Sequence, residues 1–146
     1  MLEIDAKNKW SLGMLKNIAT DNKSWNDALE YEKKLIKYYP EIKKRDESKL
    51  NYFVAMDYKD KKNEKNYLYY LNKSIQGDHI HSESYLELSS HHIDNTDLAM
   101  KYLIQFSKAN PSGSVTAFKK IEHILFDEKR FDDVESLYRK ILDQDF

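Results

Sequence analysis

Apolar side chains recur every three or four positions along nearly the whole chain, as they do on one face of an α-helix. Two stretches show this spacing clearly: Leu29, Leu35, Ile36 and Tyr39, with Glu32 on the same side, and later Leu98, Tyr102 and Phe106. No segment shows sustained two-residue alternation rich in β-branched side chains, so no β-strand is expected. The pattern therefore predicts an all-α protein.

Seven polar stretches interrupt this helical pattern at regular places. They lie at residues 19–25, 38–48, 58–66, 76–84, 92–97, 109–115 and 126–133. Pro40 and Pro111 mark two of these interruptions, because proline disfavours helical backbone at the residue before it. The intervening segments are roughly 12–15 residues long, which is common for helices of globular proteins. The sequence therefore predicts eight helices.

One pattern recurs within these helices. Ala28 stands twelve residues before Pro40, and Ala99 stands twelve residues before Pro111. Aligned positions fall at 28, 67, 99 and 134, with spacings of 39, 32 and 35 residues. Units of this length, each with two helices, are typical of stacked helical repeats. Alanine at such a position lets two helix axes approach closely, so we expect Ala28 and Ala99 to lie at helix crossings.

The recurring stretches resemble the tetratricopeptide repeat family. Its second helix, with a small residue, aromatic residues and a closing proline, is similar to SWNDALEYEKKLIKYYPE (24–41) and TDLAMKYLIQFSKANPS (96–112). The segment RFDDVESLYRKILDQDF (130–146) keeps the leading aromatic residue, and VAMDY (54–58) resembles part of the first helix. Tyr67, in contrast, stands where the family keeps a small residue.

This resemblance covers roughly residues 9–146 and implies a fold. The expected architecture is an all-α, right-handed α-solenoid of about four antiparallel helix pairs. It would form a single domain over residues 1–146, with repeats at about 9–42, 48–81, 80–113 and 115–146. Because the family usually adds a polar capping helix that is not recognisable here, we expect an open apolar side on the C-terminal helix pair and a homodimer formed through it.

Composition fits a helical protein with solvated outer faces. Hydrophobic residues make up 40% and charged residues 34%, with three glycines and two prolines among 146 residues. The absence of cysteine excludes disulfide and thiol chemistry. The N-terminal sequence lacks an apolar run of signal length, and no stretch approaches the roughly 20 apolar residues of a membrane span. We therefore expect a soluble, cytoplasmic protein with no membrane partner.

Charge is unevenly distributed although the net charge is only −1. Residues 33–73 hold twelve Lys/Arg against six Asp/Glu, whereas residues 74–146 hold eight against thirteen. The basic Lys33–Lys73 region could bind RNA, with lysines for phosphates and tyrosines for base stacking. The alternative is a solvated face whose lysines are interleaved with its own acidic residues. We favour the solvated face, and the low net charge argues against a general nucleic-acid binder.

The histidines are the first candidates for site chemistry. They stand at His79, His81, His91, His92 and His123. Zinc requires three or four ligands, and the pair of histidines four residues apart with an intervening glutamate is absent. No glycine-rich phosphate loop or nucleophile elbow occurs, and the acidic pairs stand at expected helix starts, where they stabilise the helix dipole. We expect no enzyme, no metal and no cofactor.

The family resemblance implies instead a binding groove lined by the first helix of each pair. Carried over by register, the groove-binding residues would be Asn17, Lys49, Tyr52, Met56, His81, His91, Lys119 and His123. Aromatic and methionine side chains supply contact area, and lysine and histidine attract acidic groups. The family's clamp for a C-terminal carboxylate is incomplete, because Gly13 stands where a lysine would accompany Asn17.

These features predict a non-catalytic protein–protein interaction module that holds a peptide or protein segment in a concave groove. The first alternative is a stand-alone inhibitor or regulator, for example a toxin-neutralising protein, that binds a folded partner on another face. The second is a nucleic-acid adaptor that uses the Lys33–Lys73 region.

Overall fold

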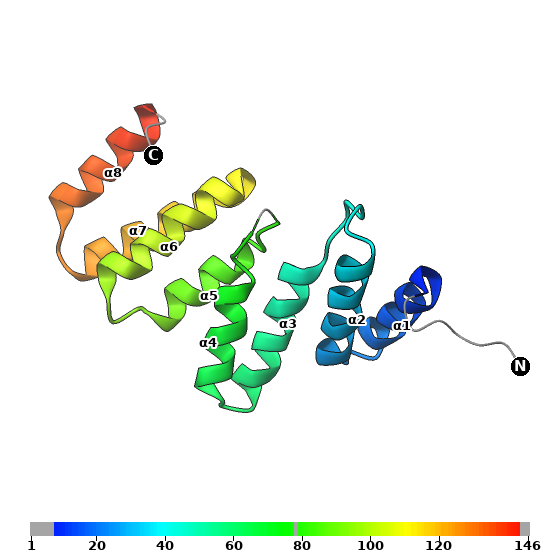
Figure 1. Cartoon of the computed structure of the whole chain (residues 1–146). Helices are drawn as coiled ribbons and strands as arrows, with labels where there is room; N and C mark the ends of the chain where they lie inside the picture. Colours follow the sequence, from blue (N-terminus) through cyan, green and yellow to red (C-terminus); the bar gives the residue numbers. More distant parts are fainter. Residues whose placement is uncertain (1–7, 78, 144–146) are drawn as a thin grey trace, which may run out of the picture. The chain divides into compact units, whose positions relative to one another are not determined.

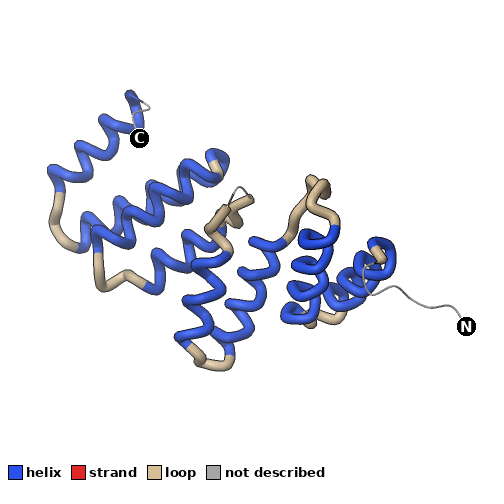
Figure 2. Tube along the Cα trace, in the orientation of Figure 1, coloured by secondary structure: helices blue, strands red, loops and turns tan. Residues whose placement is uncertain are grey.

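The computed structural model describes residues 8–77 and 79–143, and Figure 1 shows their helices in sequence order. Eight α-helices occur in these residues, as the sequence predicts, and Figure 2 shows no strand in the described chain. Their bounds are α1 Lys9–Asp21, α2 Trp25–Tyr38, α3 Glu47–Asp60, α4 Glu64–Lys73, α5 Glu83–His91, α6 Thr96–Ala109, α7 Ser114–Asp127 and α8 Phe131–Asp143. A short 3-10 turn, Pro111–Gly113, precedes α7.

None of the helices in this described part is both long and apolar enough to pass through a membrane.

The chain forms two compact units, each built from two helix pairs. Unit 1 spans Met1–His81 and contains α1 to α4, and unit 2 spans Ser82–Phe146 and contains α5 to α8. Consecutive helices pack together in both units, α1 with α2, α3 with α4, α5 with α6, and α7 with α8. Further contacts of α2 with α3 and of α6 with α7 join the two pairs within each unit. The bounds of the four repeats, and their grouping in one domain, stay predictions.

The recurring sequence positions lie in the core. Ala28 and Ala99 are completely buried, which places two short side chains inside the packed helix pairs. Tyr67 and Val134, at the aligned positions of the other two pairs, are also buried. The large ring of Tyr67 is therefore accommodated where the other pairs bury a smaller side chain. The expected placement of Ala28 and Ala99 inside the helix packing is confirmed, and the aligned positions of the other two pairs are buried as well.

A turn with one hydrogen-bond pattern joins the helices in three of the four pairs. Lys23, Lys62 and Lys129 occupy its left-handed position, with φ of 58°, 58° and 57°. The next residue donates its N–H to the carbonyl five residues back, Ser24 to Ala19, Asn63 to Tyr58 and Arg130 to Leu125, at 2.8–2.9 Å. This bond is the one that closes a helix C-terminus in the Schellman motif. The α5–α6 connection differs, because there Asn95 donates to the carbonyl of His92.

A charged cluster lies inside unit 1. The Glu32 side chain is only 2% exposed, and its Oε2 lies 2.5 Å from Nζ of Lys16. The same Nζ lies 2.9 Å from Oδ2 of Asp46, so one ammonium group contacts two carboxylates. No well-aligned hydrogen bond from the described residues reaches Glu32 Oε2, so charge holds this contact together. The cluster ties α1 and α2 to the residue that precedes α3.

This cluster shifts the pKa values of two of its members. Burial lowers the pKa of Lys16, but the interactions with Glu32 and Asp46 outweigh burial and raise this pKa above its usual value. Burial likewise raises the pKa of Asp46, but Lys16, together with the charges of Lys44 and Lys49, brings it below the usual value. Both shifts favour the charged forms at neutral pH.

Candidate functional site

The eight predicted groove residues fall into two sets, one in each unit. Unit 1 contains Asn17, Lys49, Tyr52, Met56 and His81, and unit 2 contains His91, Lys119 and His123. Each unit has hollows in its surface that contact some of these residues.

In unit 1, three of the predicted residues lie together beside the start of α3. Lys49 and His81 line a hollow of about 410 Å³. The ring of Tyr52 packs on the His81 ring, with centroids 4.6 Å apart, and the His81 backbone N–H donates to the Ser74 carbonyl at 3.0 Å. Asn17 is exposed on α1 and Met56 is half-buried on α3, and neither lines this hollow.

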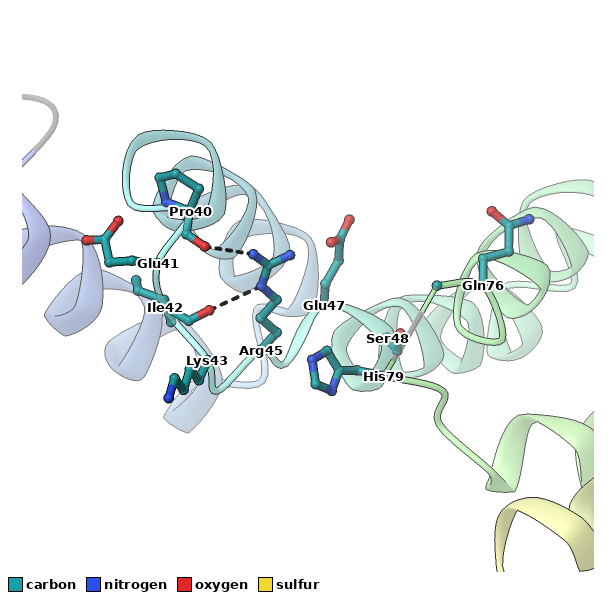
Figure 3. Close-up of a pocket in the computed structure, with 10 residues that line it drawn as sticks. Pro40, Glu41, Ile42, Lys43, Arg45, Glu47, Ser48, Gln76 and His79 are labelled. Atoms are coloured by element: carbon teal, nitrogen blue, oxygen red, sulfur yellow. Dashed lines mark hydrogen bonds between the residues drawn. The ribbon is translucent and has the colours of Figure 1, made fainter.

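A second hollow of unit 1, shown in Figure 3, is lined by none of the eight predicted groove residues. Its volume is about 600 Å³, and it lies between segments 40–48 and 76–79. Arg45 is fixed there because Nη2 donates to the Pro40 carbonyl at 3.0 Å and Nε to the Ile42 carbonyl at 3.3 Å (Figure 3). Lys43 and Arg45 line it, but so do Glu41 and Glu47, so its charges are balanced.

Arg45 belongs to the basic run that follows Pro40. This run is the sequence feature that could have indicated a site here. Its neighbour in the hollow, His79, lies more than thirty residues further along the chain. Sequence spacing alone does not bring these two residues together.

In unit 2, a hollow of about 390 Å³ lies between α5 and α7, and we call it the α5–α7 hollow. The residues that line it are Ser89, Ser90, Ile93, Leu103, Thr116, Lys119, Lys120, His123 and Ile124. Ile93, Leu103 and Ile124 provide an apolar surface, of which Leu103 is part of the core. Lys119, Lys120 and His123 are exposed on α7 and place cationic or ionisable groups beside it. Two predicted groove residues, Lys119 and His123, therefore meet in one hollow.

Other polar groups of unit 2 are already engaged in local contacts. Ser89 donates its hydroxyl to the Ala99 carbonyl at 3.0 Å. His123 Nε2 lies 3.4 Å from the Asp127 carboxylate, one turn further along the exposed face of α7. His91 packs against His92, with ring centroids 4.9 Å apart, at the end of α5, and does not line the hollow.

Between residue 8 and residue 143, with residue 78 excepted, no three histidine or acidic side chains gather closely enough to hold a metal ion.

The fold and its hollows define a class: an all-helical protein whose eight described helices pack in consecutive pairs. No family model matches the chain, and no curated protein matches its sequence.

Proposed function

We propose that this chain is a non-catalytic protein-binding module, a short right-handed solenoid of the tetratricopeptide kind. The consecutive pairing of helices supports the proposal. So do the buried positions at a period in the mid-thirties and the turn that returns in three pairs. The helices are already formed, so binding would order the partner and not the scaffold.

The α5–α7 hollow carries the proposal. It lies between the first helices of two adjacent pairs, which is where the predicted groove would run. An apolar partner side chain would contact Ile93 and Ile124 there, and burial contributes about 25 cal/mol per Å² of apolar surface. Lys119 and Lys120 would attract acidic groups beside that side chain and speed association. The ligand that fits best is a peptide segment with an apolar residue next to carboxylates.

The test is a charge reversal at the hollow. Lys119→Glu with Lys120→Glu should abolish capture of a partner from cell lysate and weaken the purified partner's binding by tenfold or more, as titration calorimetry would measure. Lys101→Glu with Lys108→Glu is the matched control, because both lysines are exposed on α6 and neither lines the hollow. Equal loss of binding in the two variants would show that the partner responds to the net charge of the chain and not to the hollow.

Equal binding by both variants would move the site to another face, as the inhibitor or regulator alternative expects. Ile93→Ser adds an independent check, since Ile93 lines the hollow but is 51% exposed and contributes little to the core. It should weaken the partner's binding without lowering the melting temperature.

The nucleic-acid alternative has less support. Several lysines of the Lys33–Lys73 region lie over tyrosine rings of the same chain, for example Lys34 over Tyr31 at 5.9 Å and Lys61 over Tyr58 at 5.6 Å. These contacts use the ring faces on which bases would stack. Steep weakening of partner binding with salt, at a slope set by the number of phosphate contacts, would favour nucleic acid instead.

A further inference from the structure

The first described helix exposes an apolar face. Trp10, Met14 and Ile18 follow one another at four-residue intervals and therefore lie on one side of α1. Trp10 is 74% and Ile18 52% exposed, and Leu15 beside them is also exposed. The opposite side of α1 is the one that packs, through Leu12 and Ala19. We call Trp10, Met14, Leu15 and Ile18 the α1 face.

The last described helix has a comparable face. Phe131, Tyr138 and Leu142 are spaced by seven and four residues, which places them on one side of α8. Phe131 is 56% and Leu142 82% exposed, whereas Val134, which adjoins this side, and Leu137, further round the helix, are buried. We call Phe131, Tyr138 and Leu142 the α8 face. Both helices contain 13 residues, so the two faces match in length at about 20 Å.

The two units carry opposite net charge. Unit 1 holds sixteen Lys/Arg against thirteen Asp/Glu, and unit 2 holds eight against twelve. The net charges are therefore +3 and −4 with histidine neutral. Two copies of the chain attract when unit 1 of one approaches unit 2 of the other, and repel when like units meet. Charge complementarity therefore selects the partner of each face.

From these observations we infer that the α1 face binds the α8 face of a second copy of this chain, head to tail. Exposed tryptophan, phenylalanine and leucine side chains provide the apolar contact, and the opposite charges of the units fix the orientation. Pairing of two C-terminal helix pairs would instead bring two copies of unit 2 together, each with a net charge of −4. The two faces of a head-to-tail contact differ, so each copy offers one face to each neighbour.

This difference between the faces permits a complementation experiment. One variant, Trp10→Ser with Ile18→Ser, lacks the α1 face, and another, Phe131→Ser with Leu142→Ser, lacks the α8 face. All four side chains are more than half exposed, so both variants should fold with the wild-type circular dichroism spectrum. The control is Tyr69→Ser with Val115→Ser, which removes two exposed apolar side chains outside both faces. Molar masses are measured by sedimentation equilibrium over a wide range of concentration.

The wild type and the control should increase in mass with concentration, and high salt should reduce this increase. Each face variant alone should remain a monomer. An equimolar mixture of the two face variants should form pairs of twice the monomer mass and nothing larger, because each supplies the face that the other lacks.

Three results would overturn the inference. They are a wild type that stays monomeric at every concentration, self-association of the variant that lacks only the α1 face, and a mixture that stays monomeric. If a serine variant unfolds, the same mixture can be prepared from Ile18→Lys and Leu142→Lys, each a single change at an exposed position.

Discussion

The two units are each built from two helix pairs, but they differ in what they bury. Unit 1 encloses the Glu32 carboxylate, which depends on the ammonium group of Lys16. In the described part of unit 2, the buried polar side chains are the neutral Ser84, Ser89 and Ser107, of which Ser89 and Ser107 donate to backbone carbonyls of α6. A buried hydroxyl needs one nearby acceptor, whereas a buried charge needs a specific counter-charge. Single substitutions should therefore affect the units unequally.

The largest effect is expected from breaking the ion pair of unit 1. Lys16→Met leaves the Glu32 carboxylate buried without its counter-charge and should lower the free energy of unfolding by about 3–5 kcal/mol. Ser89→Ala in unit 2 removes one hydrogen bond and should cost about 1 kcal/mol. Urea titrations followed by circular dichroism measure both, and Lys16→Met combined with Glu32→Leu should recover most of the loss. Equal losses of unfolding free energy in Lys16→Met and Ser89→Ala would contradict the expected difference between the two units.

The second comparison uses one glycine from each unit. A Cβ on Gly113 would lie 2.7 Å from Cε1 of the buried Phe106 ring, so Gly113→Ala should destabilise by about 1–3 kcal/mol. A Cβ on Gly13, inside α1, would meet nothing within 4 Å, so Gly13→Ala should stabilise by about 0.5–1 kcal/mol through helix propensity. Melting temperatures shifting in the same direction would show that one of these two environments is wrongly described.

The charged cluster also predicts how stability depends on pH. The folded pKa of Asp46 lies below the usual 3.8, so its contribution is complete above that value and is lost as pH falls through the folded pKa. Lys16 has a raised pKa, so its contribution is complete below the usual 10.5 and is lost at higher pH. Asp46→Asn should therefore cost stability at neutral pH and little in strong acid. A cost that does not change with pH would exclude this role for Asp46.

The smallest expected effect concerns the turn that the two units share. Lysine in left-handed backbone is strained, whereas glycine adopts it freely. Lys62→Gly in unit 1 and Lys129→Gly in unit 2 should each stabilise the chain by up to about 1 kcal/mol, as thermal unfolding would show. Lys61→Gly is the control, because Lys61 has an ordinary negative φ of −81°. Glycine at this position should lower the stability of the protein or leave it unchanged.

Local periodicity predicted the helices and the buried positions, because both follow from one face of one helix. The positions of Ala28 and Ala99 followed from the recurrence of one pattern along the sequence, without knowledge of how the helices pack. The ion pair could not be predicted in this way, since Glu32 stands on an apolar stripe and its partner Lys16 lies on another helix. The first helix shows the same limit, because its own periodicity did not indicate that the side with Leu12 and Ala19 would pack.

The candidate site was predictable only in part. The repeat register predicted that Lys119 and His123 belong to one surface. Both line the α5–α7 hollow, because they lie on one face of α7. It did not indicate that Ile93 and Leu103 would provide the apolar surface beside them, since this depends on how α5, α6 and α7 pack. His91 was predicted by the same reasoning, but it packs on His92 at the end of α5 instead of lining that hollow.

Hydrogen–deuterium exchange of the whole chain, with and without its captured partner, shows whether the partner binds between α5 and α7. Binding there should concentrate added protection in Glu83–His91 and Ser114–Asp127, and the Lys119→Glu, Lys120→Glu variant should lose this protection. Protection confined to α1 to α4, or unchanged by that variant, would contradict binding there.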